Sequence, residues 1–436
     1  MTDYTNPETI VLHTAYHADP TTGAVAVPIY QTSSYDLGDT QNAADLFALK
    51  KLGNIYSRIM SPTNDVLERR MAALDGGAAA LALASGQAAI TTAIQNIAQA
   101  GDNIVSSTEL YGGTVNLFAN SLRTMGIEVR FVDPADPENF RRATDGHTRA
   151  FFAETLPNPS LIPAPMQEIA LIGEELGVPL IVDNTNAPVI CRPIDHGAHV
   201  VVYSATKYIG GHGTSIGGLI VDSGRFDWAR HAERFPMLTQ PDPSYHGAIW
   251  TEAVAELGPI AYIMKARCTL LRDTGAAMSP FNAFLFLQGL ETLPLRMREH
   301  CRNADAVARF LADHPAVERV IFPGLFEGPD KTRAETYLTG GNGALVGFEM
   351  TGGTEAGLAF IDALKMIHHV ANIGDARTLA IHPATSTHQQ LSEDAQRAAG
   401  VTPGYVRLSI GLENVTDIEA DIAQALDSVG GLAKAA

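Results

Sequence analysis

The stretch VVYSATKYIGGHGTSIGG, residues 201–218, joins the pattern of a buried strand to a polar, glycine-rich end. Its apolar beginning is typical of a strand covered on both faces, as in a parallel sheet. Such a strand would place Ser204, Thr206 and Lys207 together at its carboxyl end, where open α/β sheets bind their ligands. The glycines that follow would let a ligand approach the backbone closely. The stretch therefore predicts an α/β fold with a ligand site around one lysine.

Three interpretations of Lys207 compete. A surface lysine on a flexible loop is the ordinary situation, but it leaves the surrounding hydroxyls and glycines unexplained. A nucleotide-binding loop lacks its fingerprint, because Ile216 stands where a dinucleotide motif has glycine and no Gly-Lys-Ser or Gly-Lys-Thr follows. The remaining interpretation is a lysine that forms an imine, with hydroxyls placed for a phosphate group.

Length and composition restrict the class of protein. A chain of 436 residues is long enough for two or three domains and a large core. It has no apolar run of about 18 residues, and MTDYTNPETI lacks a signal sequence, so we expect a cytoplasmic protein with no membrane span. The net charge of −18 argues against nucleic-acid binding. Three widely spaced cysteines, Cys191, Cys268 and Cys301, suit a reducing compartment and form no metal-binding pattern.

Strand and helix patterns alternate along the first half of the chain. A helix that begins near Asn64 is expected to end at Gly76-Gly77, and a second helix is expected over 86–101. Further strands are expected at residues 80–85, 103–107, 128–133, 149–155 and 178–184. This alternation predicts a mostly parallel sheet with helices on both faces.

Polar residues follow several of these strands. Tyr111 comes shortly after one strand, Asn158 follows another, and Asp183 closes the apolar run PLIV. A carboxylate in that position is costly to bury unless it meets a cation or a strong donor, although a helix-capping aspartate is the simpler interpretation. Because the carboxyl ends of parallel strands meet at one edge of the sheet, these residues are expected to lie near Lys207.

A strand-to-helix junction adds an expected anion site. Ser85, Gly86 and Gln87 lie between a predicted strand and a predicted helix, where free backbone N–H groups and the helix dipole favour an anion. An arginine beside a Ser-Pro turn, Arg58, with its neighbour Tyr56, offers a second phosphate-binding group, and a surface ion pair is the alternative.

The composition changes after about residue 272, so three parts are expected: an N-terminal arm over 1–62, a cofactor-binding domain over 63–272 and a smaller α+β domain over 273–436. In the last part, Arg407 lies in the alternating segment YVRLSIG and could point at a substrate carboxylate. A solvated strand arginine is the alternative. The proline-rich segment FPMLTQPDPSYHG, residues 235–247, is long enough to be a binding loop.

These groups together match the needs of pyridoxal 5′-phosphate. Asp183 would keep the pyridine nitrogen protonated, Tyr111 would stack on the ring, and Lys207 would move protons at the α and β carbons of an amino acid. The phosphate group would be held by Gly86, Gln87, Ser204 and Thr206.

Motifs from almost the whole chain carry a family resemblance. The motifs are YSRIMSPTN, LASGQAA, ELYGGT, ETLPNP, IVDNT, YSATKYIGGHG and RLSIGLE. With these, the chain resembles the Cys/Met-metabolism family of pyridoxal-phosphate enzymes of fold type I. The resemblance implies that Tyr56 and Arg58 complete the active site of a neighbouring subunit, in a homotetramer built from dimers. It also implies that Arg407 binds the substrate carboxylate and that Asn158 lies near the cofactor.

Within the family, the chain is most similar to the O-acetylhomoserine sulfhydrylases. Lyases and γ-synthases usually read Ser-Leu-Gly where this chain has Asn372-Ile373-Gly374, and methionine γ-lyases carry cysteine at Gly113. The expected reaction is a γ-replacement, in which sulfide or a small thiol displaces acetate from O-acetyl-L-homoserine. Asn372 is expected to contact the substrate with Tyr56 and Arg407, and the share of Arg377 stays open.

Other functions stay open as well. Cystathionine γ-synthase and O-succinylhomoserine sulfhydrylase differ only in the acyl group and the nucleophile, and methionine or cystathionine γ-lyase is a less favoured possibility. A non-catalytic relative or scaffold would be expected to lack Lys207, Asp183 or Arg407, and all three are present.

Overall fold

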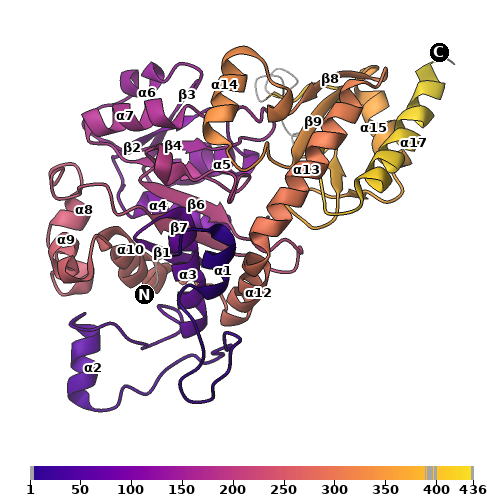
Figure 1. Cartoon of the computed structure of the whole chain (residues 1–436). Helices are drawn as coiled ribbons and strands as arrows, with labels where there is room; N and C mark the ends of the chain where they lie inside the picture. The colour runs from indigo at the N-terminus through magenta and orange to yellow at the C-terminus, as the bar shows by residue number, and fades with distance from the viewer. Residues whose placement is uncertain (1–3, 388, 390–395, 397–399, 434–436) are drawn as a thin grey trace.

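The computed structural model describes residues 4–387, 389, 396 and 400–433, which form two β-sheets flanked by helices (Figure 1). The larger sheet has the strand order β1-β7-β6-β5-β4-β2-β3. Its strands are β1 Ala79–Leu83, β2 Asn103–Ser107, β3 Glu128–Val132, β4 Thr148–Glu154, β5 Leu180–Asp183, β6 Val200–Ser204 and β7 Gly218–Asp222. Only β7 runs against its neighbours β1 and β6, so the prediction of a mostly parallel sheet is confirmed.

The expected strands and the first helix agree with the structure to within about two residues. Helix α3, Pro62–Asp75, ends at Gly76, which adopts the left-handed conformation with φ 72° that glycine tolerates best. The helix expected over 86–101 is shorter: α4 spans Gly86–Gln95. It ends at Asn96, whose buried side-chain amide donates to the backbone carbonyl of Tyr262. Strand β7 was not expected, since its apolar residues directly follow a run of glycines.

Strand β6 shows how the larger sheet separates two hydrophobic cores. Val201 and Tyr203 pack into one core with α3 and with α7, Met166–Leu176. The alternate residues Val200 and Val202 pack into the opposite core with α4 and α10, Ala261–Ala266. This alternation follows from the two-residue period of a strand. Burial of each such valine stabilises the fold by roughly 1.5–3 kcal/mol, so the sheet is a rigid base for its carboxyl edge.

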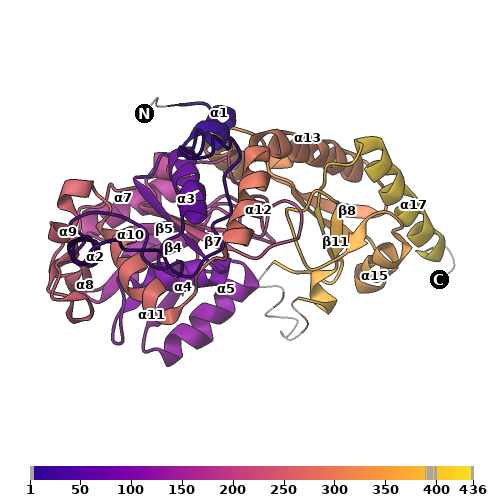
Figure 2. The ribbon, with the colours of Figure 1, turned by 90° about the horizontal axis from the view of Figure 1, so that it is seen from below.

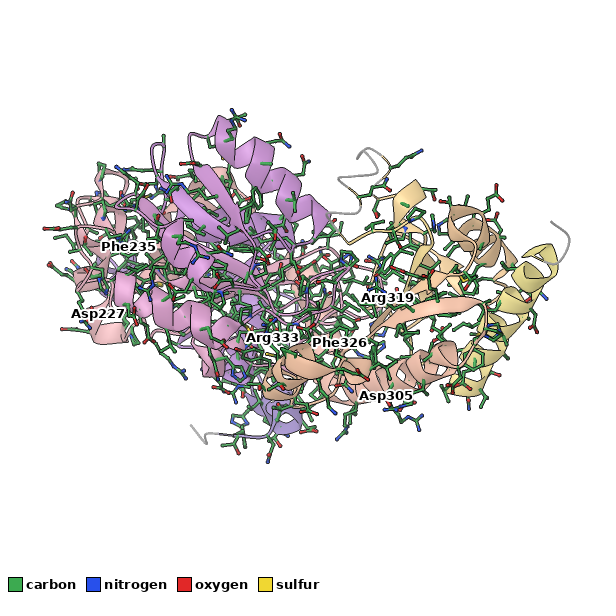
Figure 3. The ribbon with its side chains drawn as sticks, turned by 90° about the horizontal axis from the view of Figure 1, so that it is seen from above. Asp227, Phe235, Asp305, Arg319, Phe326 and Arg333 are labelled. Carbon is green, nitrogen blue, oxygen red and sulfur yellow. The ribbon has the colours of Figure 1, made fainter. Side chains whose placement is uncertain are left out.

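The smaller sheet has the order β10-β11-β12-β9-β8 and belongs to the last part of the chain. Its strands are β8 Val317–Ile321, β9 Leu345–Met350, β10 His368–His369, β11 Leu379–Ile381 and β12 Tyr405–Ser409. Three helices accompany it: α13 Leu293–Ala312, α15 Gly353–Ala363 and α17 Val415–Ala433. Figure 2 shows these elements at one end of the molecule and the larger sheet at the other. In Figure 3 the same separation places Phe235 and Asp227 toward one end and Arg319 and Asp305 toward the other.

The N-terminal arm has one packed end and one projecting end. Helix α1, Pro7–His13, packs on α3, while α2, Thr40–Phe47, lies apart from both sheets at the lower left of Figure 1. The boundaries of the three expected parts, 1–62, 63–272 and 273–436, stay predictions. Among the residues that the structure describes, no helix is long and apolar enough to cross a membrane.

Candidate active site

A cavity of about 300 Å³ opens at the carboxyl edge of the larger sheet. It lies between the ends of β4, β5 and β6, the segment that links β10 to β11, and Arg407 of β12. Of the residues predicted from the sequence, it is lined by Ser85, Gly86, Gln87, Tyr111, Asn158, Asp183, Ser204, Thr206, Lys207, Asn372 and Arg407. The structure therefore brings together residues that are spread over most of the chain.

Lys207 follows β6 in a tight turn, in which its backbone N–H donates to the carbonyl of Ser204. Its Nζ atom donates a hydrogen bond of 2.6 Å to Oδ1 of Asn372. Burial lowers the pKa of Lys207, and the positive charge of Arg407 lowers it further. A lower pKa makes the neutral amine more available, and the neutral amine is the form that attacks a carbonyl group or accepts a proton.

The beginning of α4 lies directly against the end of β6. A Cβ atom on Gly86 would come within 2.8 Å of Cβ of Ser204, so this approach requires glycine. Ser85 caps the helix, since its Oγ accepts from the N–H of Ala88 at 3.1 Å. The first amides of a helix have no intrahelical partner, so the junction can bind an anion. Thr206 completes the turn through Oγ1, which accepts from the N–H of Gly217 at 3.1 Å.

Two carboxyl groups, Glu154 and Asp183, lie on adjacent parallel strands in register with each other. Burial, and then the negative charge of Asp183, raise the pKa of Glu154 well above its usual range. Burial also raises the pKa of Asp183 to about 6. Glu154 accepts a 2.7 Å hydrogen bond from the N–H of Tyr111, and Asp183 accepts one of 2.9 Å from the N–H of Thr185. Asp183 is therefore the carboxyl group that ionises more readily.

Arg407 reaches the cavity from β12 and is only 7% exposed. One guanidinium nitrogen donates to the backbone carbonyl of Asn372 at 3.0 Å, while Nε has no partner among the residues that the structure describes. Burial lowers the pKa of this arginine. A carboxylate in the cavity would satisfy the free N–H and stabilise the buried charge, because arginine pairs with carboxylates through two parallel bonds.

Within the described part of the chain, other buried polar atoms around the cavity also lack partners. These atoms are Oε1 of Gln87, Oγ1 of Thr114, Oδ1 of Asn158 and Oδ1 of Asn186. A buried polar group without a hydrogen bond costs about 1–3 kcal/mol, so such a cluster indicates a site for a polar ligand. An anion site, a lysine amine, a carboxylate and the ring of Tyr111 surround the same space. These residues fit pyridoxal 5′-phosphate.

Several residues that line the cavity were not predicted from the sequence: Thr114, Thr185, Asn186, Ile216, Ala371 and Ile373. Thr185 and Asn186 could have been found, because they continue past the strand end marked by Asp183. Thr114 directly follows the two glycines after Tyr111. No comparable signal in the sequence indicates Ile216 or Ala371.

Tyr56 and Arg58 lie on the N-terminal arm, outside the lining of this cavity. The Arg58 guanidinium lies 5.3 Å from the centre of the Tyr56 ring and donates to the backbone carbonyl of Arg272. Arg377 also lies outside the lining. It donates two bonds, of 2.8 and 3.0 Å, to the Asp375 carboxylate and a third to the carbonyl of His212, so it fastens the glycine-rich stretch after Lys207.

Replacement of Gly113 with alanine is expected to move the Tyr111 ring. A Cβ atom at Gly113 would lie 2.9 Å from Cζ of Tyr111 and 3.1 Å from Nε2 of Gln87. Because the displacement of a positioned group by about 1 Å can cost up to 10²-fold, kcat/KM should fall about 10–100-fold in steady-state assays. Gly112→Ala is the matched control, since a Cβ atom there meets nothing within 4 Å. Equal effects of the two substitutions would contradict the prediction.

The geometry of this cavity is that of the fold type I enzymes that use pyridoxal 5′-phosphate. A family model described as "Cys/Met metabolism PLP-dependent enzyme" matches residues 8–427, and the chain belongs to that family. It is therefore a PLP-dependent enzyme of Cys/Met metabolism.

Named relatives cover nearly the whole chain. The chain is 53% identical to the O-acetyl-L-homoserine sulfhydrylase of Leptospira meyeri over 97% of both chains. It is 50% identical to O-acetyl-L-homoserine sulfhydrylase 1 of Thermus thermophilus, over 96% of this chain and 99% of that one. A crystal structure of a putative O-acetylhomoserine (thiol)-lyase from Campylobacter jejuni superposes with a TM-score of 0.93 at 40% identity, covering 97% of this chain and 100% of that one. That structure holds N'-pyridoxyl-lysine-5'-monophosphate at its position 205.

Proposed function

We propose that the chain catalyses a γ-replacement on O-acetyl-L-homoserine, in which sulfide displaces acetate and gives L-homocysteine. Methanethiol in place of sulfide would give L-methionine. The proposal is supported by the names of relatives that match almost the whole chain. The observation that carries it is the contact of Lys207 with Asn372, whose backbone carbonyl also binds Arg407. A proton-transferring amine thereby lies beside a group that can bind the carboxylate of an amino acid.

The cavity residues have proposed roles toward the cofactor. When bound, pyridoxal 5′-phosphate supplies an aldehyde for the substrate amine and a ring that accepts electrons from the substrate carbon atoms. Asp183 would hold a proton on the ring nitrogen, and Tyr111 would cover one face of the ring. The start of α4 would hold the phosphate group together with Ser204 and Thr206, and Asn158 would donate to the ring oxygen.

Arg407 and Lys207 would act on the substrate in sequence. Arg407 binds the α-carboxylate and so orients the amino acid over the cavity. Lys207 then removes a proton from the α carbon and another from the β carbon, and the bond between the γ carbon and the ester oxygen breaks. The sulfur of the incoming nucleophile bonds to the γ carbon, and Lys207 returns the protons. Acetate leaves with the bonding electrons, so no oxidant or reductant is needed.

Asn372 would stabilise Lys207 whenever the amine carries a proton. Its Oδ1 atom already accepts from Nζ at 2.6 Å, and an amide oxygen is a better partner for an ammonium group than for a neutral amine. Since the same residue binds Arg407 through its backbone carbonyl, it links the proton-transferring group to the carboxylate-binding group. We expect Asn372 to contact the substrate carboxylate as well.

The enzyme would work as an assembly of several copies of this chain in the cytoplasm. Tyr56 and Arg58 would complete the cavity of a neighbouring copy, in a homotetramer built from dimers. Their position outside the cavity of their own chain supports this arrangement. Small-molecule substrates in the cytoplasm, with no nucleic acid or membrane as partner, complete the proposal. Sedimentation of the active enzyme as a monomer would contradict the shared site.

The test compares substrates with one purified preparation that contains the cofactor. O-acetyl-L-homoserine with sulfide should give homocysteine at the highest kcat/KM, measured by chromatography of the product. A preference for the succinyl ester would indicate an O-succinylhomoserine sulfhydrylase, and a preference for cysteine as nucleophile would indicate a cystathionine γ-synthase. Release of a 2-oxo acid from methionine or cystathionine alone would indicate a lyase.

A further inference from the structure

Residues 235–250 lie against the N-terminal arm of their own chain, and none of them lines the cavity around Lys207. The segment contains the short helices α8, Pro236–Thr239, and η3, Pro243–Tyr245, and ends where α9 begins at Trp250. Tyr245 and His246 line a second cavity of about 240 Å³, whose other walls are largely residues from α2 to Met60. The segment therefore supports the arm, and the binding loop expected over 235–247 stays a prediction.

Tyr245 joins the arm to the body of the molecule. Its hydroxyl donates to the backbone carbonyl of Phe47, the last residue of α2, at 3.0 Å. On the other side, the Tyr245 ring lies 5.1 Å from the ring of Trp250, which is fully buried and donates to Asp242 at 2.8 Å. The hydroxyl that holds the arm is thus fixed by a core residue.

The helical stretch that follows residues 235–250 in the chain holds the residues around Arg58. Arg58 donates to the carbonyl of Arg272, and Arg267 donates to the carbonyl of Ile59 at 2.8 Å. The Arg272 guanidinium lies 5.9 Å from the centre of the Tyr245 ring and donates to the carbonyl of Ser244 at 3.3 Å. Both anchors of the arm therefore meet at Tyr245 and Arg272.

The arm has little apolar burial of its own between these anchors. Leu46 is the buried residue of α2, whereas Phe47 and Leu52 are 52% and 53% exposed. A segment with so little burial can be ordered by polar contacts within its own chain. Without such contacts it becomes ordered only when it binds a partner, and the loss of conformational entropy then weakens that binding. An arm that is already held in place before it meets its partner should therefore bind that partner more tightly.

We propose that Tyr245, together with Arg272, is a positioning residue that holds Tyr56 and Arg58 where a second copy of this chain takes them into its cavity. The inference rests on the shared site of the proposed function. It assigns residues 235–250 a role in the cavity of the partner subunit. Tyr245→Phe keeps the ring and removes the bond to Phe47, so the phosphate of the cofactor should be bound less tightly by the partner.

The first measurement is the dissociation constant of pyridoxal 5′-phosphate, from the visible absorbance of the lysine-bound cofactor. In the Tyr245→Phe homo-oligomer it should rise about fivefold, the equivalent of one hydrogen bond of about 1 kcal/mol. Tyr16→Phe is the matched control, because its hydroxyl bonds to the carbonyl of Ala24 within the arm and should leave the constant unchanged within about twofold. An unchanged constant in Tyr245→Phe would overturn the inference.

Mixed oligomers separate positioning from general stability. A Lys207→Ala chain has an intact arm and no reactive lysine, and an Arg58→Ala chain has the reverse. Assembled together, they should recover one complete cavity. Tyr245→Phe should regain the unmodified dissociation constant when paired with Lys207→Ala, but not when paired with Arg58→Ala. Failure of that rescue, while the first pair succeeds, would refute the role of Tyr245. Failure of the first pair would refute the shared site itself, and the inference with it.

Discussion

Replacement of Lys207 with alanine is expected to lower kcat for homocysteine formation by about 10⁴-fold, the upper range of general acid–base catalysis. Lys207 is the amine that lines the cavity, and burial lowers its pKa, so the neutral form is more abundant than it is for an exposed lysine. The same substitution should remove the visible absorbance of the lysine-bound cofactor. Stopped assays of homocysteine and an absorbance spectrum of the purified variant measure the two effects independently.

Lys265 provides the control for this experiment. It is 4% exposed, burial lowers its pKa to about 8, and its Nζ donates to Asn96 at 3.3 Å, away from the Lys207 cavity. Lys265→Met should keep the absorbance band and most of the activity. Borohydride reduction followed by peptide mass spectrometry should then find the cofactor on the peptide that contains Lys207. A band that survives in Lys207→Ala would assign the cofactor to another amine.

The fold could be predicted largely because the buried strands carry strong local signals. Strand β2 agrees residue for residue with the strand expected at 103–107, β4 is shifted by one residue from its expected range, and β5 lies inside its expected range. Because parallel strands end at one edge, the polar residues after them were expected to gather, and Tyr111, Asn158 and Asp183 line one cavity. The direction of β7 could not be predicted, since an apolar pattern is the same whichever way a strand runs.

The contacts across the two sheets could not be predicted from local patterns. Asn372 reaches Lys207 only because the smaller sheet is placed against the cavity, and a sequence pattern carries no information on that placement. The pairing of Glu154 with Asp183 depends on the register of two strands that are separated by a helix. The bonds from Arg377 to Asp375 likewise decide that this arginine holds the backbone and does not line the cavity.

Asp183→Asn is the second substitution with a large expected effect, a fall in kcat of about 10²–10³-fold, as for loss of one preorganised charge interaction. Asparagine keeps an oxygen for the N–H of Thr185, so the local backbone should be preserved. It cannot carry the negative charge that favours a protonated ring nitrogen. The bound cofactor should therefore lose its ring proton at a lower pH, which a titration of its absorbance would detect without any turnover.

Glu154→Gln tests whether Asp183, and not Glu154, is the carboxyl group that pairs with the ring nitrogen of the cofactor. Burial and the charge of Asp183 raise the pKa of Glu154 well above its usual range, which favours the protonated form, and glutamine resembles that form. Glutamine also keeps an oxygen for the N–H of Tyr111. Turnover should fall less than about tenfold, because one neutral hydrogen bond is worth about 1 kcal/mol. If Glu154→Gln lowered turnover more than Asp183→Asn, Glu154 would be the carboxyl group that pairs with the ring nitrogen. The carboxylate of Asp183 would then serve only the fold.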